Sequence, residues 1–347
     1  MSTTAGKSLH EHYVLGLLSG SKSVTDMAER GLLPFGKAYA CKLLAQEPTP
    51  YKTALARRLA TAPQGAYLAV DLLKVEHRGE RIEGVRRCYD SNSKGVMWGH
   101  VPVSSGLVRL GEDPYLLRCD PFPDSLMSTE RYPKLTATEA MLTVAGDVVS
   151  AGVKVKALLV DAEFTTRLGL RSLKQLPLAF VGRFRNNANV MFEAQKLCVN
   201  DLAKRFLPGK ARWYPKLRRY IKRLEVVLAE VGIVELLIIW KAQGYGWHLT
   251  TLISTLTAGV QDVFKAWSAH WSLEVSHRLR KQNLALGSCQ SLSYAAHLQH
   301  AELVNRAFEL MRQERQRTPG LSWKLAQHYA TETLKNALLT GGPRLAA

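Results

Sequence analysis

The spacing of apolar residues along the chain predicts helices at both ends and a mixture of strands and helices between them. Residues 9–47 carry apolar positions at helical intervals in three short runs, which glycine-containing turns separate. The segments 66–73, 82–89 and 96–110 have the apolar or alternating pattern of strands, and the turn-forming sequence DSNSKG joins the second to the third. We therefore expect an antiparallel meander whose first strand carries Asp71.

The next part of the chain alternates helix and strand patterns. A proline-rich connection at residues 114–133 leads to a predicted helix at 136–152. The sequence KALLVDAEF then reads as a short buried strand that ends in Asp161, and a helix and the strand PLAFVGRF follow it. This alternation favours an α/β sheet. Residues 224–256 return to strand patterning, and the chain after Ser291 is predicted to be helical.

The charge balance narrows the class of partner. The 347 residues include 47 Lys and Arg against 29 Asp and Glu, a formal net charge of +18. Such an excess predicts a polyanionic partner, with nucleic acid first and an anionic membrane surface second. The membrane is disfavoured, because the most apolar run, 226–240, contains Glu230 and Glu235 and is shorter than the ~20 residues of a spanning helix. The N-terminus also lacks the pattern of a secretory signal.

The cysteines point to a reducing environment. They lie far apart with no C-x-x-C pair, so they indicate neither a zinc site nor a disulfide framework. We expect free thiols and a cytoplasmic setting. The five are Cys41, Cys88, Cys119, Cys198 and Cys289.

A run of basic and aromatic residues between Ala203 and Leu224 is the best candidate for nucleic-acid contact. It contains no acid; its basic residues are Lys204, Arg205, Lys210, Arg212, Lys216, Arg218, Arg219, Lys222 and Arg223, and its aromatic residues are Phe206, Trp213, Tyr214 and Tyr220. Basic groups neutralise phosphates and aromatic faces stack on bases. The alternative is a solvated charge run, which the aromatic residues disfavour. The three N-terminal helices are a second candidate, as a helix-turn-helix or as a structural cap.

The stretch WSAHWSLEVSHRLRKQNLAL at 267–286 mixes a carboxylate with basic and aromatic groups. Separations of three, four and seven residues return to the same side of an α-helix. One broad face therefore combines Trp267, His270, Trp271, Glu274, Arg278 and Lys281. This is the pattern of a metal-dependent site that handles phosphate, or of a solvated amphipathic helix.

Two aspartates upstream favour the site. Asp71 and Asp161 each lie at the end of an apolar strand, where a carboxylate is costly without a partner or a metal. If the two strands are neighbours and the helix with Glu274 crosses their ends, three carboxylates meet. That is a ligand set for Mg²⁺ or Mn²⁺, and two such ions support phosphodiester chemistry. Each aspartate taken singly is more often a turn or cap residue.

Three blocks of the sequence resemble the catalytic blocks of DDE transposases, most closely the insertion sequence 4 group. They are VDLLKVEHRGERIEGVRRCYDSNSKGVMWGH, then LLVDAEF with FVGRFRNN, then WSLEVSHRLRKQNLALG. The group carries Tyr-x2-Arg-x3-Glu-x6-Lys around its third acid. Glu274 and Lys281 match this spacing, whereas Trp267 and His270 stand at the Tyr and Arg positions, and Leu72 stands where relatives have Asp or Thr.

The resemblance implies a ribonuclease H-like fold, a mixed sheet flanked by helices, with a β-rich insertion and an N-terminal helical domain. We expect units at 1–62 (helical), 63–188 (first catalytic part), 189–262 (basic, β-rich insertion) and 263–347 (the Glu helix and C-terminal helices). The resemblance further implies that Asp71, Asp161 and Glu274 bind two Mg²⁺ or Mn²⁺ ions.

The resemblance also implies an activity, a partner and association with a bacterial nucleoid. A homodimer would cut transposon ends and join their 3′-OH to target DNA. His270, Arg278 and Lys281 would contact phosphates, and Trp267 would stack on or wedge beside a displaced base. The rival predictions are a domesticated DNA-binding protein without activity and a metal-dependent nuclease without strand transfer.

Overall fold

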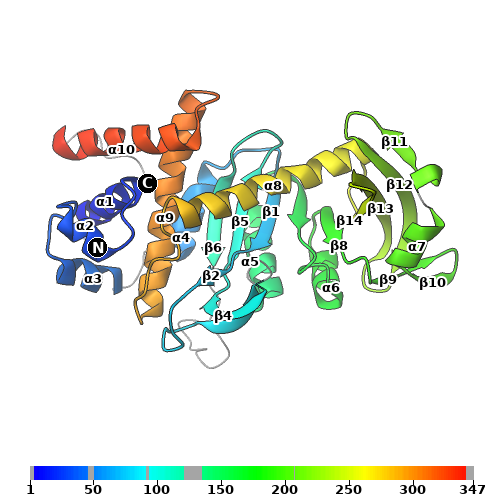
Figure 1. The fold of residues 1–347 in the computed structure, drawn as a ribbon, viewed down its shortest axis with the longest axis horizontal. Coiled ribbons are helices and arrows are strands. Elements are labelled where there is room, and N and C mark those ends of the chain that lie inside the picture. Colours follow the sequence, from blue (N-terminus) through cyan, green and yellow to red (C-terminus); the bar gives the residue numbers. More distant parts are fainter. Residues whose placement is uncertain (1–3, 46–50, 91–93, 121–134, 207, 341–347) are drawn as a thin grey trace.

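The protein is built around one large mixed sheet with helices on both faces and a helical unit at one end (Figure 1). The structure, a computed structural model, describes residues 4–45, 51–90, 94–120, 135–206 and 208–340. Within these ranges no helix is both long enough and apolar enough to cross a membrane.

Five strands form the part of the sheet that positions the acids. They are β1 (Ala66–Leu72), β5 (Val103–Val108), β6 (Tyr115–Asp120), β7 (Val155–Val160) and β8 (Phe180–Phe184). Their order is β6-β5-β1-β7-β8, with β5 antiparallel to both β1 and β6, and with β7 parallel to both β1 and β8. The carboxyl ends of β1 and β7 therefore lie side by side. The predicted α/β sheet is confirmed.

Alternating apolar side chains on these strands explain why both faces of the sheet are covered. Leu68 and Leu158 pack in a core with helix α5 (Ala137–Ser150) and helix α6 (Arg167–Gln175) on one face. Their neighbours in sequence, Ala69 and Leu159, belong to a second core that includes apolar residues of helix α8 (Val260–Gln282) on the other face. Successive strand residues point to opposite faces, so a fully apolar strand serves both cores.

The segment after β8 continues the same sheet instead of forming a separate one. Strand β14 pairs antiparallel with β8, and the order outward is β8-β14-β13-β12-β9-β10, with β11 on β12. The predicted strands at 224–256 are thus present, and β12 already begins inside the basic run. The bounds are β9 (Asn189–Phe192), β10 (Gln195–Cys198), α7 (Val199–Arg205), a 3-10 turn (Pro208–Lys210), β11 (Arg212–Tyr214), β12 (Arg219–Leu228), β13 (Gly232–Gln243) and β14 (Gly246–Ser254).

The predicted antiparallel meander is wrong in its connections. Strand β3 (Arg86–Asp90) and strand β4 (Gly95–His100) form a small separate sheet with β2 (Val75–Glu76), and of the strands in the predicted meander only β5 pairs with β1. The run 96–110 is interrupted at Pro102, whose missing N–H cannot extend a ladder. The chain changes sheets there. Strand β6 was also unforeseen, and residues 121–133 of the predicted connection lie outside the described part of the chain.

Helices from the two ends of the chain pack on each other (Figure 1). The Tyr13 hydroxyl hydrogen bonds with His300 Nδ1 at 2.8 Å, and Gln327 donates to the carbonyl of Leu18 at 2.9 Å. The helical prediction for both ends is confirmed, but the N-terminal helices do not stand alone. These helices are α1 (Thr4–Leu18), α2 (Val24–Glu29), α3 (Lys37–Ala45), α4 (Tyr51–Ala60), α9 (Tyr294–Arg317) and α10 (Trp323–Thr340).

Candidate active site

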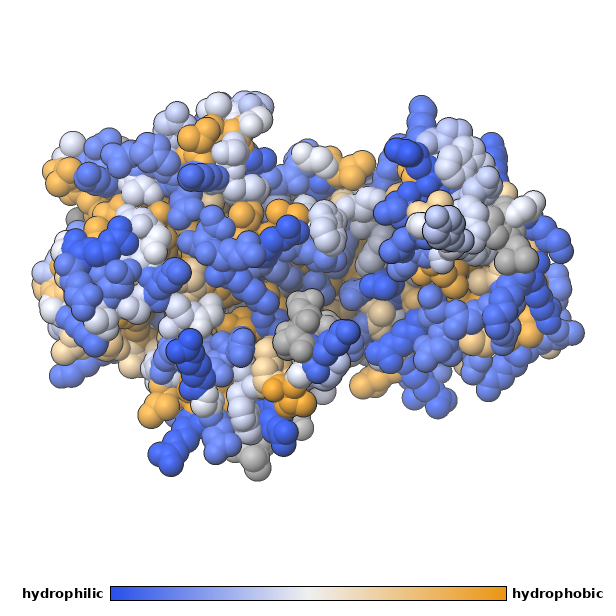
Figure 2. Space-filling view, viewed as in Figure 1, coloured by the Kyte–Doolittle hydropathy of each residue, from blue (hydrophilic) through white to orange (hydrophobic). Residues whose placement is uncertain are grey.

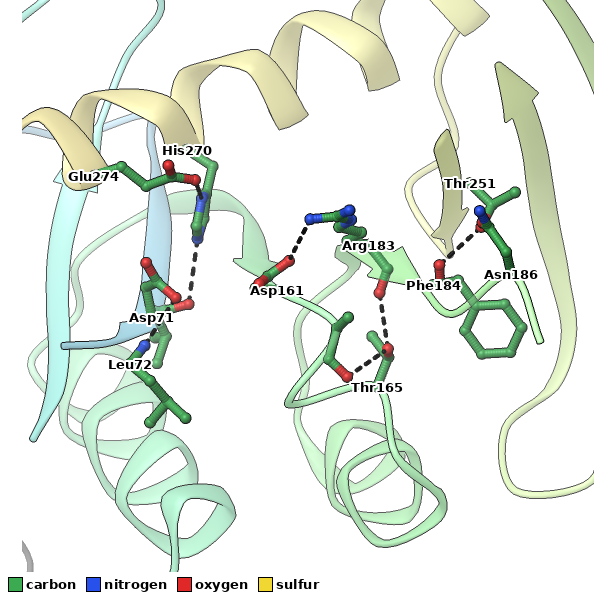
Figure 3. Close-up of polar contacts among 12 residues, drawn as sticks. Asp71, Leu72, Asp161, Thr165, Arg183, Phe184, Asn186, Thr251, His270 and Glu274 are labelled. Carbon is green, nitrogen blue, oxygen red and sulfur yellow. Dashed lines mark hydrogen bonds and ion pairs between the residues drawn. The ribbon is translucent and has the colours of Figure 1, made fainter. Parts of the chain in front are cut away.

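The three predicted acids come from three elements that meet at one edge of the sheet (Figure 3). Asp71 is the penultimate residue of β1, and Asp161 follows β7 directly. Because β1 and β7 are parallel, with Val70 opposite Val160, the next residue on each strand reaches the same edge. Glu274 lies past the middle of α8, the helix that packs across β1 and β7. The structure thus brings together the carboxylates that the sequence singled out.

Burial and repulsion between the carboxylates raise the pKa of Asp71 and of Glu274. The side chain of Asp71 is 15% exposed. Burial, and then the charge of Asp161, raise its pKa to about 7, although the backbone N–H of Leu72 and the ammonium of Lys281 work in the opposite direction. Burial and the charge of Asp71 also raise the pKa of Glu274, against a smaller opposing effect of His270. The cluster therefore carries more negative charge than the surrounding protein neutralises.

This donor set fits hard divalent cations. Carboxylate oxygens are the ligands that Mg²⁺ and Mn²⁺ prefer, and a cation would remove the repulsion between the acids. Within the described ranges the ligand oxygens of Asp71, Asp161 and Glu274 do not all lie within 4.8 Å of one another. The three carboxylates, as they stand, are therefore spaced too widely for all three to contact a single ion at about 2.1 Å.

Two neighbours of the acids were not singled out from the sequence. His277 Nδ1 lies 3.6 Å from Asp71 Oδ2, and burial, followed by the charge of Arg280, lowers the pKa of this histidine well below its usual value. The ring is therefore neutral and does not form an ion pair. Arg183 Nη1 lies 4.0 Å from Asp161 Oδ1. The helical spacing of three from Glu274 would have indicated His277, and the parallel pairing of β7 with β8 would have indicated Arg183.

The phosphate contact predicted for His270 does not fit its position. The residue is 1% exposed, its Nε2 lies 3.3 Å from the carbonyl of Val70, and its Nδ1 lies 3.9 Å from Glu274 Oε1. Burial lowers its pKa, so the ring is neutral near pH 7. Its flat face stacks on Trp267 with ring centroids 4.9 Å apart and an interplanar angle of 12°. His270 is placed to orient Glu274 against β1.

The other members of the predicted helix face point in different directions. Trp271 is 56% exposed, and Arg278 and Lys281 are also exposed. The buried stripe of α8 includes Ser276, His277 and Arg280, which are polar. The predicted single face is therefore split between the sheet and solvent.

The basic run lies mainly on α7 and on the hairpin of β11 and β12, at the end of the molecule opposite α10 in Figure 1. Its aromatic residues are partly engaged within the protein: the Lys222 ammonium lies 4.7 Å from the Phe206 ring centroid, and Trp213 packs against Tyr220 with centroids 4.8 Å apart. Arg223 pairs with Glu235 across the β12–β13 ladder. Trp213 is 45% exposed and remains accessible to a base. Figure 2 shows that hydrophilic residues dominate the visible surface at this end.

A cleft of about 400 Å³ connects this end of the sheet to Glu274. Strands β12 to β14 form one wall, and the exposed side of α8 forms the other. The strand wall contributes cationic and imidazole groups, and the helix wall contributes indole rings. Its lining includes Arg219, Lys241, His248, Trp267, Trp271 and Glu274.

The fold and the three acids define the class of protein. The sheet is ribonuclease H-like; one acid lies on its first strand, one directly follows the parallel strand beside it, and one lies on the helix that crosses both strands. The family model described as DDE superfamily endonuclease matches residues 3–232. The chain belongs to this family. The match includes Asp71 and Asp161 and ends before Glu274, which is therefore placed by geometry and by the spacing of its sequence block.

The fold also resembles that of a solved transposase. The chain is similar to a protein in a structure described as a cryo-EM structure of piggyBac transposase synaptic complex with hairpin DNA. The TM-score is 0.52 at 13% identity, covering 97% of this chain and 73% of that one. A search of the curated proteins finds no match. The predicted ribonuclease H-like fold and DDE family are confirmed.

Proposed function

We propose that this DDE endonuclease is a DNA transposase that cuts transposon ends and joins their 3′-OH groups to target DNA. The observation that carries the proposal is the convergence of Asp71, Asp161 and Glu274 with their charge uncompensated, as the raised pKa of Asp71 records. Asp71, Asp161 and Glu274 would hold two Mg²⁺ or Mn²⁺ ions. When bound, such ions activate the attacking oxygen and stabilise the leaving oxygen of a phosphodiester.

The neighbouring residues of this chain would position those acids and the DNA. His270 and His277 are buried and neutral, and they hold the sides of Glu274 and Asp71 without adding charge. Lys281 acts electrostatically on Asp71, so its ammonium is close enough to engage a phosphate that lies at the acids. Arg278, one turn after Glu274 on α8, would contact the backbone further from the reacting bond.

The cleft beside α8 is the proposed path of the DNA strand to the acids. Its basic wall would neutralise phosphates, and its two indoles offer stacking surfaces for an unpaired base. Of the two indoles Trp267 is the less exposed; it stacks on His270 and would wedge beside a displaced base. The basic run would extend this contact along the duplex through Lys210, Arg212, Trp213, Lys216, Arg218, Arg219, Lys222 and Arg223.

The joining reaction implies a homodimer on DNA. Both ends of a mobile element must be cut and inserted together, so two active sites are needed in one complex. The similar structure is described as a synaptic complex of a transposase with hairpin DNA.

The deciding experiment is cleavage of DNA taken from the two flanks of the gene, where a transposase predicts a pair of inverted repeats. Asp71→Ala, Asp161→Ala and Glu274→Ala should each abolish Mg²⁺-dependent nicking and keep DNA binding within a few-fold of wild type. Asp262→Asn is the matched control, since it removes an exposed acid of the same helix α8 and should leave nicking unchanged. Full cleavage by any one of the three alanine variants would overturn the site.

The products of the same assay separate transposase from nuclease. A transposase yields ends joined to a target plasmid, whereas a nuclease yields only nicked or cut DNA. No cleavage by the wild-type protein on its cognate end would favour a domesticated DNA-binding protein.

A further inference from the structure

Away from the acids, three histidines form a closed buried cluster. His77 follows β2, His100 ends β4, and His297 lies in the first turn of α9. The three residues are 4–6% exposed. Each pair of rings has centroids 4.6 Å apart, and one nitrogen from each ring lies within 4.8 Å of the others. The nitrogens therefore surround one point.

Backbone carbonyls fix the proton positions on two of these rings. His100 Nε2 lies 2.8 Å from the carbonyl of Glu83, and His297 Nε2 lies 2.7 Å from the carbonyl of Ser291. A carbonyl only accepts, so both Nε2 atoms carry the proton, and both Nδ1 atoms keep a lone pair. This arrangement, with one nitrogen donating to a backbone carbonyl and the other left basic, is the usual support of a metal-bound histidine.

The third ring cannot satisfy its hydrogen bonds within the protein alone. His77 Nε2 lies 2.8 Å from the basic Nδ1 of His100. The buried Nδ1 of His77 makes no well-formed hydrogen bond, although the backbone of Cys289 lies near this ring. If the proton is on Nε2, Nδ1 is a buried acceptor with no donor. If the proton is on Nδ1, beside the backbone of Cys289, two lone pairs face each other at 2.8 Å. In the second case, a cation that binds His77 Nε2 and His100 Nδ1 removes the repulsion between their lone pairs.

We propose that His77, His100 and His297 bind a structural Zn²⁺ ion that joins the small β2-β4-β3 sheet to helix α9. Imidazole nitrogen suits Zn²⁺, whereas Mg²⁺ prefers oxygen ligands. In tetrahedral zinc with Zn–N bonds of about 2.0 to 2.1 Å, neighbouring nitrogens lie about 3.3 Å apart. The present nitrogens reach that geometry through small side-chain rotations. Burial lowers the pKa of all three rings, so they are neutral and able to ligate at pH 7.

The fourth ligand would be a water molecule. A cavity of about 30 Å³ adjoins the three rings, which is room for one water. His300 also lines it, but its nitrogens lie 2.8 Å from the hydroxyl of Tyr13 and 3.0 Å from the carbonyl of Ala285, so neither is available to the ion. The rest of the lining is Val75, Pro102, Leu286 and Ala301, which is apolar and offers a substrate no polar partner. We therefore assign the ion a structural role.

The test uses Co²⁺ as a spectroscopic probe on the full-length protein. The Asp71→Asn background removes one ligand of the carboxylate site, and chelation removes any metal already bound. Co²⁺ should then bind with one equivalent showing the intense visible absorption of tetrahedral coordination. Zn²⁺ should abolish this absorption by displacement, and Zn²⁺ alone should raise the melting temperature of the chelated protein. Carboxylate-bound Co²⁺ is octahedral and absorbs weakly, so the two sites are distinguishable.

Variants locate the ion. His297→Ala should lose the tetrahedral absorption and the Zn²⁺-dependent rise in melting temperature, whereas His328→Ala, which removes an exposed histidine of α10, should keep both. A folded His297→Ala protein that keeps the tetrahedral absorption would overturn the assignment. If that variant does not fold, the wild-type titration still decides: no tetrahedral absorption and no thermal shift with Zn²⁺ would mean that the histidines form only a hydrogen-bonded cluster.

Discussion

Replacement of Asp71 by asparagine should stabilise the metal-free protein, although it removes a proposed metal ligand. The folded environment raises the pKa of this carboxyl from 3.8 to about 7, mainly through burial and the charge of Asp161. One tenfold change in proton affinity corresponds to about 1.4 kcal/mol, so ionised Asp71 costs the folded state up to about 4 kcal/mol. Asparagine keeps the shape and can accept the N–H of Leu72, the 2.8 Å hydrogen bond that Asp71 accepts now.

The stability difference between wild type and Asp71→Asn should depend on pH, and the raised pKa of Asp71 sets the direction of that dependence. Below pH 3.8 the carboxyl is protonated in both states, and the two proteins should be equally stable. Between pH 3.8 and about 7 the unfolded chain releases the proton and the folded chain retains it, so wild-type stability falls as the pH rises. Above pH 7 the difference is complete and constant.

The measurement is urea unfolding of both proteins in EDTA at pH 4, 6 and 8.5. We expect the free energy of unfolding of Asp71→Asn to exceed that of wild type by an amount that grows to about 4 kcal/mol at pH 8.5. Mg²⁺ should stabilise wild type more than the variant. An equal difference at pH 4 and pH 8.5, or a less stable variant at pH 8.5, would refute the reasoning.

Two further predictions concern the loop after β7 and the end of α8. A Cβ at Gly169 would lie 1.9 Å from the carbonyl oxygen of Phe164, in the loop after Asp161. Gly169→Ala should therefore lower the free energy of unfolding by about 3 kcal/mol and slow cleavage. Gly146→Ala is the control: it lies at an open position of helix α5 and should raise the free energy of unfolding by about 0.5 to 1 kcal/mol in the same urea titration. Lys281→Gln removes a charge that lowers the pKa of Asp71, so the acidic limb of the cleavage profile should move to higher pH. The slope of log binding constant against log salt should also fall by about 0.9, and an unchanged slope would exclude a phosphate contact.

The sequence indicated that the two aspartates could meet, because the position of a residue at the end of a strand follows from the geometry of the sheet. An aspartate at the end of each of two apolar strands reaches a common edge once those strands are parallel neighbours, as the pairing of Val70 with Val160 shows. The apolar runs at 155–160 and 180–184 were therefore sufficient to predict strands β7 and β8, whereas β6 was not predicted. The change of sheet at Pro102 was not foreseen, because the run around it looks like one continuous strand.

The orientation of α8 was harder to predict because its buried stripe is polar. Arg280 is fully buried and donates to Asn305 Oδ1 at 2.7 Å and to Ser104 Oγ at 2.9 Å. Sequence patterns place charged residues outside, so the inward turn of this arginine, and of His270 and His277 with it, was not predictable from periodicity.

The histidine cluster was invisible in the sequence for another reason. Its members are separated by 23 residues between His77 and His100 and by almost 200 more to His297, without a recognisable ligand spacing. Only the docking of the small sheet on α9 brings them together. A search by motif detects metal sites on one or two neighbouring elements and misses those assembled from three.

The packing of α1 on α9 and α10 also affects how the chain folds. The hydrogen bonds of Tyr13 with His300 and of Gln327 with Leu18 join residues 287 and 309 positions apart. Val14, Leu17 and Leu18 are buried in this packing, so they stay without their final partners until the C-terminal helices have been synthesised. Contacts of such long sequence separation slow folding. Helix α1 therefore reaches its final position only after α9 and α10 have been synthesised, and until then its apolar face is exposed and can promote aggregation.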